Sequence, residues 1–360
     1  PEVQRQFARR GIVLIPPGIG RRRLDEEIRR GRKSEAEVIV GDGPWAVQST
    51  EPVSAAETLP LLVHASKSCP TDGSVEYVRR LDPRIDLYLR DHQLDGKPVL
   101  PLAMAAELMA EVVQHSWPDL VVVAIKDLHL FRGIVIQEGV AEVQVAARSS
   151  VHAPQEQFAL DVDVKITTMD QPDRVHYRAT VQLAQRFPDP PAFTPPQFTN
   201  MQTFPLTVTE AYAQWLFHGP CFQRITLIEG SSEQGMAVTV LPSSPKDCLE
   251  GVSTGRWLID PMLIDVGPQL AILWTRAHKD MTALPSYFHR YRRFGLLPEA
   301  SIRCYFHVRP GIAEHILHGD VYFVGASGQL LGLVEGLETS CSKALNRLAG
   351  TVATEKERNV

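Results

Sequence analysis

The chain has 360 residues and 44% of them are apolar, so it is long enough to bury a large core and to form about two domains. Its formal net charge of −5 excludes a general basic surface for gripping nucleic acid. No run of about 18 apolar residues could span a bilayer, and the sequence does not start with a signal-peptide pattern, so we expect a cytoplasmic protein with no membrane contact.

The five cysteines are scattered along the chain, and none belongs to a C-x2-C pair. This spacing argues against a disulfide framework and against a zinc site. We expect reduced, mostly buried thiols at Cys69, Cys221, Cys248, Cys304 and Cys341.

Residues 1–48 form a segment without a core of its own. They contain an apolar stretch at 11–17, a charged helix-like stretch at 21–33 and a short strand at 36–40. We interpret the charged stretch as a solvated helix face, because acidic residues interrupt its arginines. The segment is therefore expected to be the trailing end of another domain.

The region from about 75 to 186 carries the pattern of an antiparallel sheet around a buried helix. Apolar and polar residues alternate from 160 to 166 and from 175 to 183, as in strands with one buried face, and a proline-aspartate pair predicts the turn between them. Residues 102–113 are apolar on nearly every face, which indicates a helix enclosed by the structure.

A proline-rich stretch at 188–196 is stiff and extended, cannot pair into a sheet, and is the best internal boundary. Beyond it the same order of elements recurs, with one apolar helix from about 261 to 275 among short strands. A glycine-containing turn at 325–328 joins the last two strands as a hairpin. The expected strands lie at 226–228, 236–241, 302–308, 316–324 and 330–337. This order predicts two similar halves, each a sheet curled round one helix.

His92 is the first candidate for chemistry, since a histidine exchanges a proton near neutral pH. It opens the spacing H-x3-G-x4-P with Gly96 and Pro101, directly before the first apolar helix. Gly96 permits a tight turn that lets a ligand approach the main chain, and Pro101 suits the first helical position, where free amides favour a developing negative charge. A base beside such an oxyanion site removes a proton next to a carbonyl. The alternative is a structural or exposed histidine, because the chain has 12 of them.

Asp265 lies more than one turn inside the second apolar helix, for which Asp260 and Pro261 supply the N-cap and the first position. Its neighbours are mostly apolar, so we expect a desolvated carboxyl with a raised pKa that acts as a proton donor. Gln269 shares its helix face and is expected to orient that carboxyl or a substrate hydroxyl. The alternative is an Asp265 that is exposed on a polar seam.

A third motif stands between these two candidates in the chain. It places His218, Gly219 and Pro220 after one aromatic side chain and before another, Phe222, which a glutamine follows. By itself the motif indicates a tight, partly buried turn, and a purely structural role stays open.

These three motifs, in this order and spacing, resemble the dehydratase domains of polyketide synthases and of related fatty-acid megasynthases. That family has the pattern H-x3-G-x4-P, a glycine-proline-phenylalanine turn, and D-x3-Q or D-x3-H. The resemblance spans about residues 50–345. One position departs from it: His218 stands where the family turn often carries a tyrosine, so a hydroxyl contact is missing or replaced by imidazole.

The resemblance implies an α+β protein with the double hotdog fold. In this fold two tandem hotdog folds each wrap an antiparallel sheet round a central helix, and the active site lies where they meet. We therefore expect an N-terminal hotdog at 49–190, a proline-rich linker at 191–200, a C-terminal hotdog at 201–345, and a polar C-terminal tail or linker at 346–360.

The resemblance also implies a 3-hydroxyacyl thioester substrate, carried on the phosphopantetheine arm of an acyl carrier protein. His92 would remove the C2 proton, and a protonated Asp265 would protonate the departing C3 hydroxyl, leaving a 2,3-enoyl thioester and water. The domain itself is expected to bind no metal and no redox cofactor. Substrate-binding or orienting roles fall to Gly96, Pro101, His218, Gly219, Pro220, Phe222 and Gln269.

Residues 1–48 resemble the end of a ketoreductase domain, without its nucleotide-binding and catalytic residues. A ketoreductase that runs directly into a dehydratase resembles the iterative synthases of enediynes and polyunsaturated fatty acids. The acyl carrier protein, the ketoreductase and other synthase domains are therefore the expected partners. Dimers are common in the resembled family, which leaves a homodimer open.

Two other functions stay open. A product-template domain has the same fold and uses a His/Asp pair to steer aldol cyclisation, although the ketoreductase tail argues against it because that chemistry acts on unreduced chains. A non-catalytic dehydratase-like module would only scaffold the carrier protein or a dimer. His92 and Asp265 argue against such a scaffold, and His218 argues slightly for it.

Overall fold

The structure, a computed structural model, describes residues 59–68, 74–137, 139–149, 160–310 and 314–350, together with Arg21 and Leu24. Arg21 and Leu24 are helical and exposed, and the other predictions for residues 1–48 fall outside the described residues. The remaining described residues belong to one compact unit of the chain. None of their helices is both long and apolar enough to cross a membrane.

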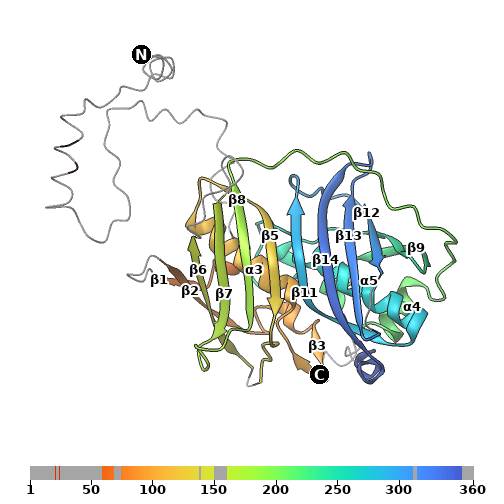
Figure 1. The fold of residues 1–360 in the computed structure, drawn as a ribbon. Coiled ribbons are helices and arrows are strands. Elements are labelled where there is room, and N and C mark those ends of the chain that lie inside the picture. Colours follow the sequence, from red (N-terminus) through yellow and green to blue (C-terminus); the bar gives the residue numbers. More distant parts are fainter. Residues whose placement is uncertain are drawn as a thin grey trace, which may run out of the picture. The chain divides into compact units, whose positions relative to one another are not determined.

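Twelve antiparallel strands form one continuous sheet (Figure 1). Their order across it is β1-β2-β6-β7-β8-β5-β11-β14-β13-β12-β10-β9, so the strands of the N-terminal half lie on one side and those of the C-terminal half on the other. A separate short hairpin joins β3 (Gln93–Leu94) to β4 (Lys97–Pro98). The strands of the large sheet are β1 (Ala65–Ser68), β2 (Val75–Leu81), β5 (Val121–Leu130), β6 (Ala141–Ser149), β7 (Leu160–Thr168), β8 (Tyr177–Ala184), β9 (Ile225–Ser232), β10 (Gly235–Val240), β11 (Thr282–Arg293), β12 (Ile302–Arg309), β13 (Ile316–Val324) and β14 (Leu330–Ser342).

One long helix lies against each half of the sheet (Figure 1). α3 (Leu102–Ser116) packs on strands of the N-terminal half, α5 (Pro261–Lys279) packs on strands of the C-terminal half, and the two helices also pack against each other. Both are almost wholly buried, because their sequences are apolar on nearly every face. The shorter helices in the described part of residues 59–350 are α4 (Val208–Gln214) and the 3-10 helices η1 (Pro60–Leu62), η2 (Leu87–Leu89), η3 (Pro220–Phe222), η4 (Pro245–Asp247) and η5 (Lys343–Leu348).

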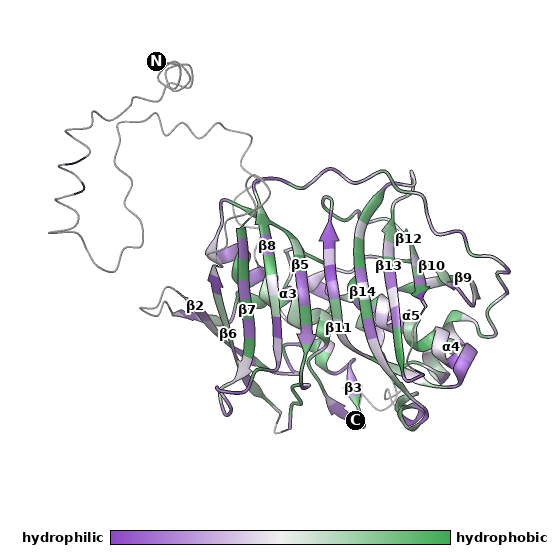
Figure 2. Cartoon of the chain, viewed as in Figure 1, coloured by the Kyte–Doolittle hydropathy of each residue, from purple (hydrophilic) through white to green (hydrophobic). Residues whose placement is uncertain are grey.

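The two halves are joined through β5 and β11, which pair in the middle of the sheet. In this pairing Ile125 lies opposite Tyr291, and both side chains are buried. One cluster of buried apolar side chains extends through both halves. Figure 2 shows hydrophobic and hydrophilic residues alternating along the strands, as expected for a sheet with one face on the helices and the other toward solvent.

The predicted pair of similar halves is confirmed, and the predicted elements are observed with shifted ends. The central strands β5 and β11 have no counterpart among the predicted strands. β11 contains Pro285, and its register shifts between Pro285 and Tyr287. A proline inside a stretch argues against a central strand, and a bulge at that point accommodates it.

The ends of the two halves differ from the expected boundaries at one point. Residues 187–198 contain no helix or strand, as the proline-rich stretch predicts. The helix η5, however, runs across the expected boundary at 345, and Leu348 is buried. Packed structure therefore continues into the segment expected to be a polar tail. The described cysteines, Cys221, Cys248, Cys304 and Cys341, are free and buried.

Candidate active site

His92 lies between η2 and the β3–β4 hairpin, and this hairpin fixes its ring. Asp95 and Gly96 form the hairpin turn with φ values of 51° and 72°, a backbone conformation that favours glycine. The turn brings Val99 back beside His92, where the Val99 N–H donates to the His92 carbonyl at 3.1 Å. The His92 Nδ1 lies 3.0 Å from the Val99 carbonyl oxygen. Because a carbonyl only accepts, Nδ1 carries the hydrogen and Nε2 keeps a free lone pair.

The surroundings of His92 keep its imidazole neutral. The residue is 9% exposed, and the ring centres of Phe217 and Phe222 lie 5.4 and 5.5 Å from its own. Burial lowers the pKa of His92 to about 4; His218 acts in the same direction, and the carboxylate of Asp265 opposes them. A neutral imidazole with a free Nε2 can act as a base at neutral pH.

Asp265 projects from the second turn of α5 and is 3% exposed, which excludes the exposed polar seam. Its Oδ2 lies 3.2 Å from His218 Nε2 and accepts a hydrogen bond from Gln269 Nε2 at 3.0 Å. Gln269 is in turn fixed by Tyr212, whose hydroxyl donates to Gln269 Oε1 at 3.0 Å. The amide is thereby oriented with its N–H toward the carboxylate.

The raised pKa expected for Asp265 is wrong. Burial acts to raise the pKa of this carboxyl, but the hydrogen bond and the electrostatic interaction with His218, with smaller effects of His92 and Gln269, lower it below its ordinary value. The sequence pattern showed the apolar neighbours on the same helix and not the two histidines that other segments bring to the carboxyl. The carboxyl of Asp265 alone therefore does not hold a proton that is ready for transfer.

His218 occupies the position between the two other polar groups. The residue is 1% exposed, and its ring stacks on Phe217 with centres 4.1 Å apart. Its backbone forms an isolated antiparallel bridge with His92, so the bridge links the two halves at the site. Its Nδ1 is buried without a hydrogen-bond partner, whereas Nε2 faces Asp265.

Asp91 locks the turn after His218 against the N-terminal half. Its backbone carbonyl accepts the N–H of Gly219 at 2.7 Å, and its Oδ2 accepts the N–H of Cys221 at 2.8 Å. A Cβ at Gly219 would overlap the Asp91 carboxylate, so this close approach requires glycine. Pro220 starts η3, which places the buried Phe222 ring against His92. Asp91 and Tyr212 also help to position the site, but neither was predicted because neither belongs to a recognisable sequence motif.

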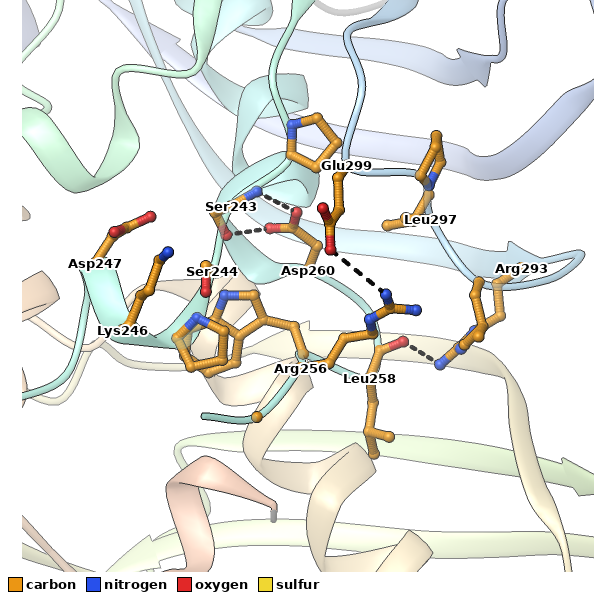
Figure 3. Close-up of a pocket in the computed structure, with 16 residues that line it drawn as sticks. Ser243, Ser244, Lys246, Asp247, Arg256, Leu258, Asp260, Arg293, Leu297 and Glu299 are labelled. Carbon is orange, nitrogen blue, oxygen red and sulfur yellow. Dashed lines mark hydrogen bonds and ion pairs between the residues drawn. The ribbon is translucent and has the colours of Figure 1, made fainter. Parts of the chain in front are cut away.

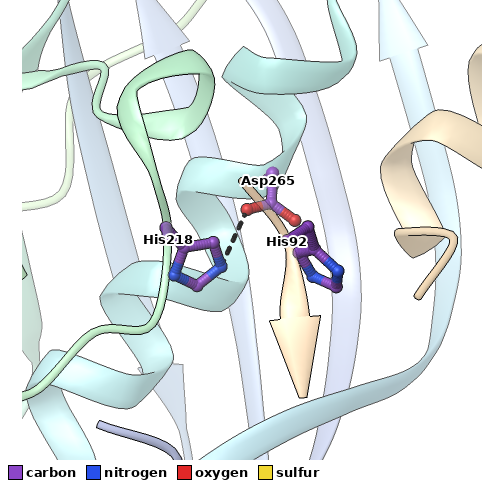
Figure 4. Close-up of side chains that lie close together, drawn as sticks. All are labelled: His92, His218 and Asp265. Carbon is purple, nitrogen blue, oxygen red and sulfur yellow. Dashed lines mark ion pairs between the residues drawn. The ribbon is translucent and has the colours of Figure 1, made fainter. Parts of the chain in front are cut away.

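The structure brings three of the predicted side chains together. His92, His218 and Asp265 each offer a nitrogen or oxygen atom, and these atoms lie within 4.8 Å of one another (Figure 4). The predicted turn at Gly96 is observed, and it forms the exposed tip of the hairpin. Pro101 was expected at the first helical position and is the N-cap of α3 instead.

A cavity of about 300 Å³ borders the start of α5 (Figure 3). Asp260, in its wall, caps the helix by accepting the N–H of Leu263 at 3.1 Å and also accepts the N–H of Ser243 at 2.7 Å. Arg293 donates to the carbonyl of Leu258 in the same wall. The residues around this cavity thus fix the first turn of the helix that carries Asp265.

A second cavity, of about 540 Å³, lies beside the bridge between the halves. Asp91, Gln93 and Cys221 line it, together with Arg90 and Arg224. His92 is not among the residues that line this cavity.

Two family models of polyketide synthase dehydratases match consecutive parts of the chain. The model described as polyketide synthase dehydratase domain matches residues 60–163. The model described as polyketide synthase dehydratase N-terminal domain matches residues 192–349. Between them they cover most of both halves.

A curated relative belongs to the polyunsaturated fatty acid synthase of Thraustochytrium sp., of which it is one subunit. It is 26% identical over 305 residues, which are 83% of this chain and 10% of the relative. The chain therefore spans about a tenth of the length of that relative.

Two solved structures illustrate the fold. The dehydratase domain from the CurF module of the curacin polyketide synthase is 14% identical, with a TM-score of 0.61, over 79% of this chain and 99% of that chain. The dehydratase domain of PpsC from Mycobacterium tuberculosis, in complex with C12:1-CoA, is 20% identical, with a TM-score of 0.58, over 79% of this chain and 100% of that chain. These likenesses confirm the predicted double hotdog fold.

Proposed function

The chain belongs to the polyketide synthase dehydratase family, and from that membership we propose that it eliminates water from a 3-hydroxyacyl thioester on an acyl carrier protein, leaving a 2,3-enoyl thioester, during polyketide or polyunsaturated fatty acid synthesis. The observation that carries this proposal is the buried convergence of His92, His218 and Asp265 from separate segments. It brings a base and a group that can donate a proton within 4.8 Å of one another.

In the proposed reaction His92 Nε2 takes the proton from C2 of the acyl chain. Its support is the hydrogen bond from Nδ1 to the Val99 carbonyl, which leaves Nε2 without a hydrogen, and the burial that keeps the ring neutral. The electron pair of the broken C–H bond forms the C2–C3 double bond as the C3 hydroxyl departs.

The departing hydroxyl needs a proton, and we assign it to the hydrogen-bonded pair of His218 and Asp265 together. Because the pKa of Asp265 is lowered by His218, one extra proton on this pair is shared between an imidazole and a carboxylate that lie 3.2 Å apart. Transfer of that proton to the hydroxyl releases water. The pair then holds one proton fewer and His92 one more, and return of a proton from His92 to the pair resets the site.

The remaining predicted residues have positioning roles in this proposal. Gln269 holds the Asp265 carboxylate, and Gly219, Pro220 and Phe222 hold His218 and the His92 ring in register. Gly96 acts through the hairpin that places Val99, and Pro101 acts by starting α3. We propose no metal or redox cofactor for this reaction.

We also propose that neighbouring domains of a larger synthase serve this chain, including a ketoreductase whose end is residues 1–48. The expected domain limits belong to the same proposal, with the C-terminal hotdog extended to 348 by η5. Support comes from the curated relative, which is part of a polyunsaturated fatty acid synthase. A carrier protein is the expected partner because the substrate is proposed to be a thioester on its arm.

The test is to incubate the chain with a 3-hydroxyacyl pantetheine thioester and to separate the products by chromatography with mass detection. We expect loss of water from the substrate, and a decrease of about 10²–10⁴-fold in rate for His92→Gln, which cannot take the proton. His289→Gln is the matched control, because that histidine is 64% exposed on the sheet. A cyclised product from an unreduced chain would support a product-template function, and an unchanged substrate with wild type would support a scaffold.

A further inference from the structure

Three side chains of the kinds that bind transition metals converge at the candidate site. Two imidazoles and one carboxylate, from His92, His218 and Asp265, are all buried, with their donor atoms within 4.8 Å of one another. From this convergence we infer that the three residues form a binding site for a divalent transition-metal ion such as Zn²⁺, and that the bound ion blocks the site. The inference concerns metal binding and goes beyond the proposed dehydration.

The distances suit a zinc ion. Zinc binds imidazole nitrogen and carboxylate oxygen at about 2.0–2.2 Å, so neighbouring ligand atoms of a tetrahedral site lie about 3.3 Å apart. His218 Nε2 and Asp265 Oδ2 lie 3.2 Å apart. Figure 4 shows the carboxylate of Asp265 between the two rings. His92 offers the remaining imidazole, with its donor atom no more than 4.8 Å from either of the other two.

The groups behind these ligands are those of a metal site. A histidine that binds a metal usually donates its other ring N–H to a backbone carbonyl or carboxylate, which fixes the ring. His92 Nδ1 makes such a bond to the Val99 carbonyl at 3.0 Å, and the Asp265 carboxylate accepts from Gln269 at 3.0 Å. Two ligands are therefore already oriented by hydrogen bonds.

With three protein ligands, a bound ion would keep at least one coordination position for an exogenous ligand. Two histidines and one carboxylate are the protein ligands of many catalytic zinc and iron sites, in which the remaining positions hold water or substrate. In this chain the ion would bind the His92 Nε2 lone pair, which is the atom proposed to take the C2 proton. Metal binding and dehydration would then exclude each other.

His218 decides whether the third ligand exists. At this position the family turn often carries a tyrosine, whose neutral phenol is a poor ligand beside an imidazole. The inferred metal site is thus a consequence of the residue at which this chain departs from the family pattern.

The experiment titrates the metal-free 360-residue chain with cobalt chloride and, separately, with zinc chloride. We expect one Co²⁺ per chain, with visible absorption bands of a four- or five-coordinate ion that added Zn²⁺ removes. We also expect Zn²⁺ to raise the melting temperature of the metal-free chain, since the ion binds the folded state. Neither measurement uses substrate, so a chain that binds the ion but dehydrates nothing would overturn the proposed function and leave this inference standing.

Two variants test the ligands, and one controls for binding elsewhere. His218→Tyr and Asp265→Asn should each weaken Zn²⁺ binding by at least about 100-fold, because changes to outer-shell partners alone cost about 10–100-fold. His289→Gln should retain the wild-type affinity, although it removes an exposed histidine 3.2 Å from Asp127. Far-ultraviolet circular dichroism checks the fold of each variant, and either ligand variant that folds is a sufficient test. Unchanged affinity in a folded ligand variant, or loss of binding in His289→Gln, would overturn the inference.

Discussion

At the residue scale, one backbone carbonyl determines which nitrogen of His92 is the base. The Val99 carbonyl binds Nδ1, and burial keeps the ring neutral by lowering its pKa to about 4. The base form is therefore present well below the pH at which an ordinary histidine, with a pKa of about 6.5, becomes protonated.

This environment predicts an unusual pH dependence. A group that acts as a base fails when it is protonated, so kcat/KM should stay level as the pH falls through about 6.5 and should decrease only as it approaches about 4. The measurement is kcat/KM for the pantetheine thioester across this range, with circular dichroism at each pH to confirm folding. A decrease centred near pH 6.5 would contradict the neutral, buried His92.

The turn after His218 gives a prediction for Gly219. Gly219→Ala places a Cβ against the Asp91 carboxylate, so we expect a loss of about 1–3 kcal/mol in the free energy of unfolding together with a loss of activity. The matched control is Gly295→Ala, since a Cβ at that position meets no atom within 4 Å. Urea unfolding of both variants measures the difference, and equal stabilities would mean that the turn does not need glycine.

At the element scale, two buried glutamates of helix α3 form hydrogen bonds to the backbone of other segments. Glu107 is completely buried and accepts the N–H groups of Leu258 and Ile259 at 2.7 and 2.9 Å. Those two residues directly precede the N-cap of α5. Glu107 therefore ties the helix of one half to the start of the helix that carries Asp265. The second glutamate, Glu111, is also completely buried and accepts the N–H of Leu61 at 2.9 Å.

Removing the hydrogen bonds of Glu107 should lower the free energy of unfolding, and the loss should depend on how many acceptor oxygens the substituted side chain keeps. Glu107→Ala leaves one buried and one partly buried N–H group without partners, at up to about 1–3 kcal/mol each, whereas Glu107→Gln keeps one oxygen acceptor and should lose less. Urea unfolding of the two variants against wild type gives both losses. If alanine and glutamine cost the same, the hydrogen bonds do not hold the two helices as described.

The sequence predicted elements better than it predicted the links between them. Alternating and all-apolar patterns located β7, β8, α3 and α5, because a single face or a fully buried surface leaves a periodic record. The bond from Leu258 to Glu107 joins residues 151 positions apart, and no local pattern indicates such a partner. At the site, the spacing of the motifs pointed to His92 and Asp265, but the direction of the Asp265 pKa depends on His218, which a separate loop supplies.

At the scale of the whole molecule, the sheet makes the two halves one body. Residues 287–292 of β11 pair with residues 124–129 of β5, and apolar side chains from both halves form one cluster. Separate unfolding of one half would expose both the paired edge and the shared core. The two halves are therefore expected to unfold together.

Calorimetry tests this expectation. The described unit should show a single cooperative transition, and Ile125→Ala, in the β5–β11 pairing, should lower the stability by about 2–5 kcal/mol without splitting the transition. A control substitution at the exposed Leu227, Leu227→Ala, should change little. Two resolved transitions, in wild type or in Ile125→Ala, would show that each half is stable alone.

The ion pair between Asp95 and Arg347 matters for anyone who wishes to excise or exchange this domain. Arg347 in η5 donates to the carboxylate of Asp95 at 2.7 and 3.0 Å, so η5 is bound to the β3–β4 hairpin that positions His92. A transferred fragment that stops at residue 345 would contain the His92 hairpin without the Arg347 ion pair, and the apolar residues that pack around Leu348 would be exposed. Recombination points for swapping this domain between synthases therefore belong after residue 350.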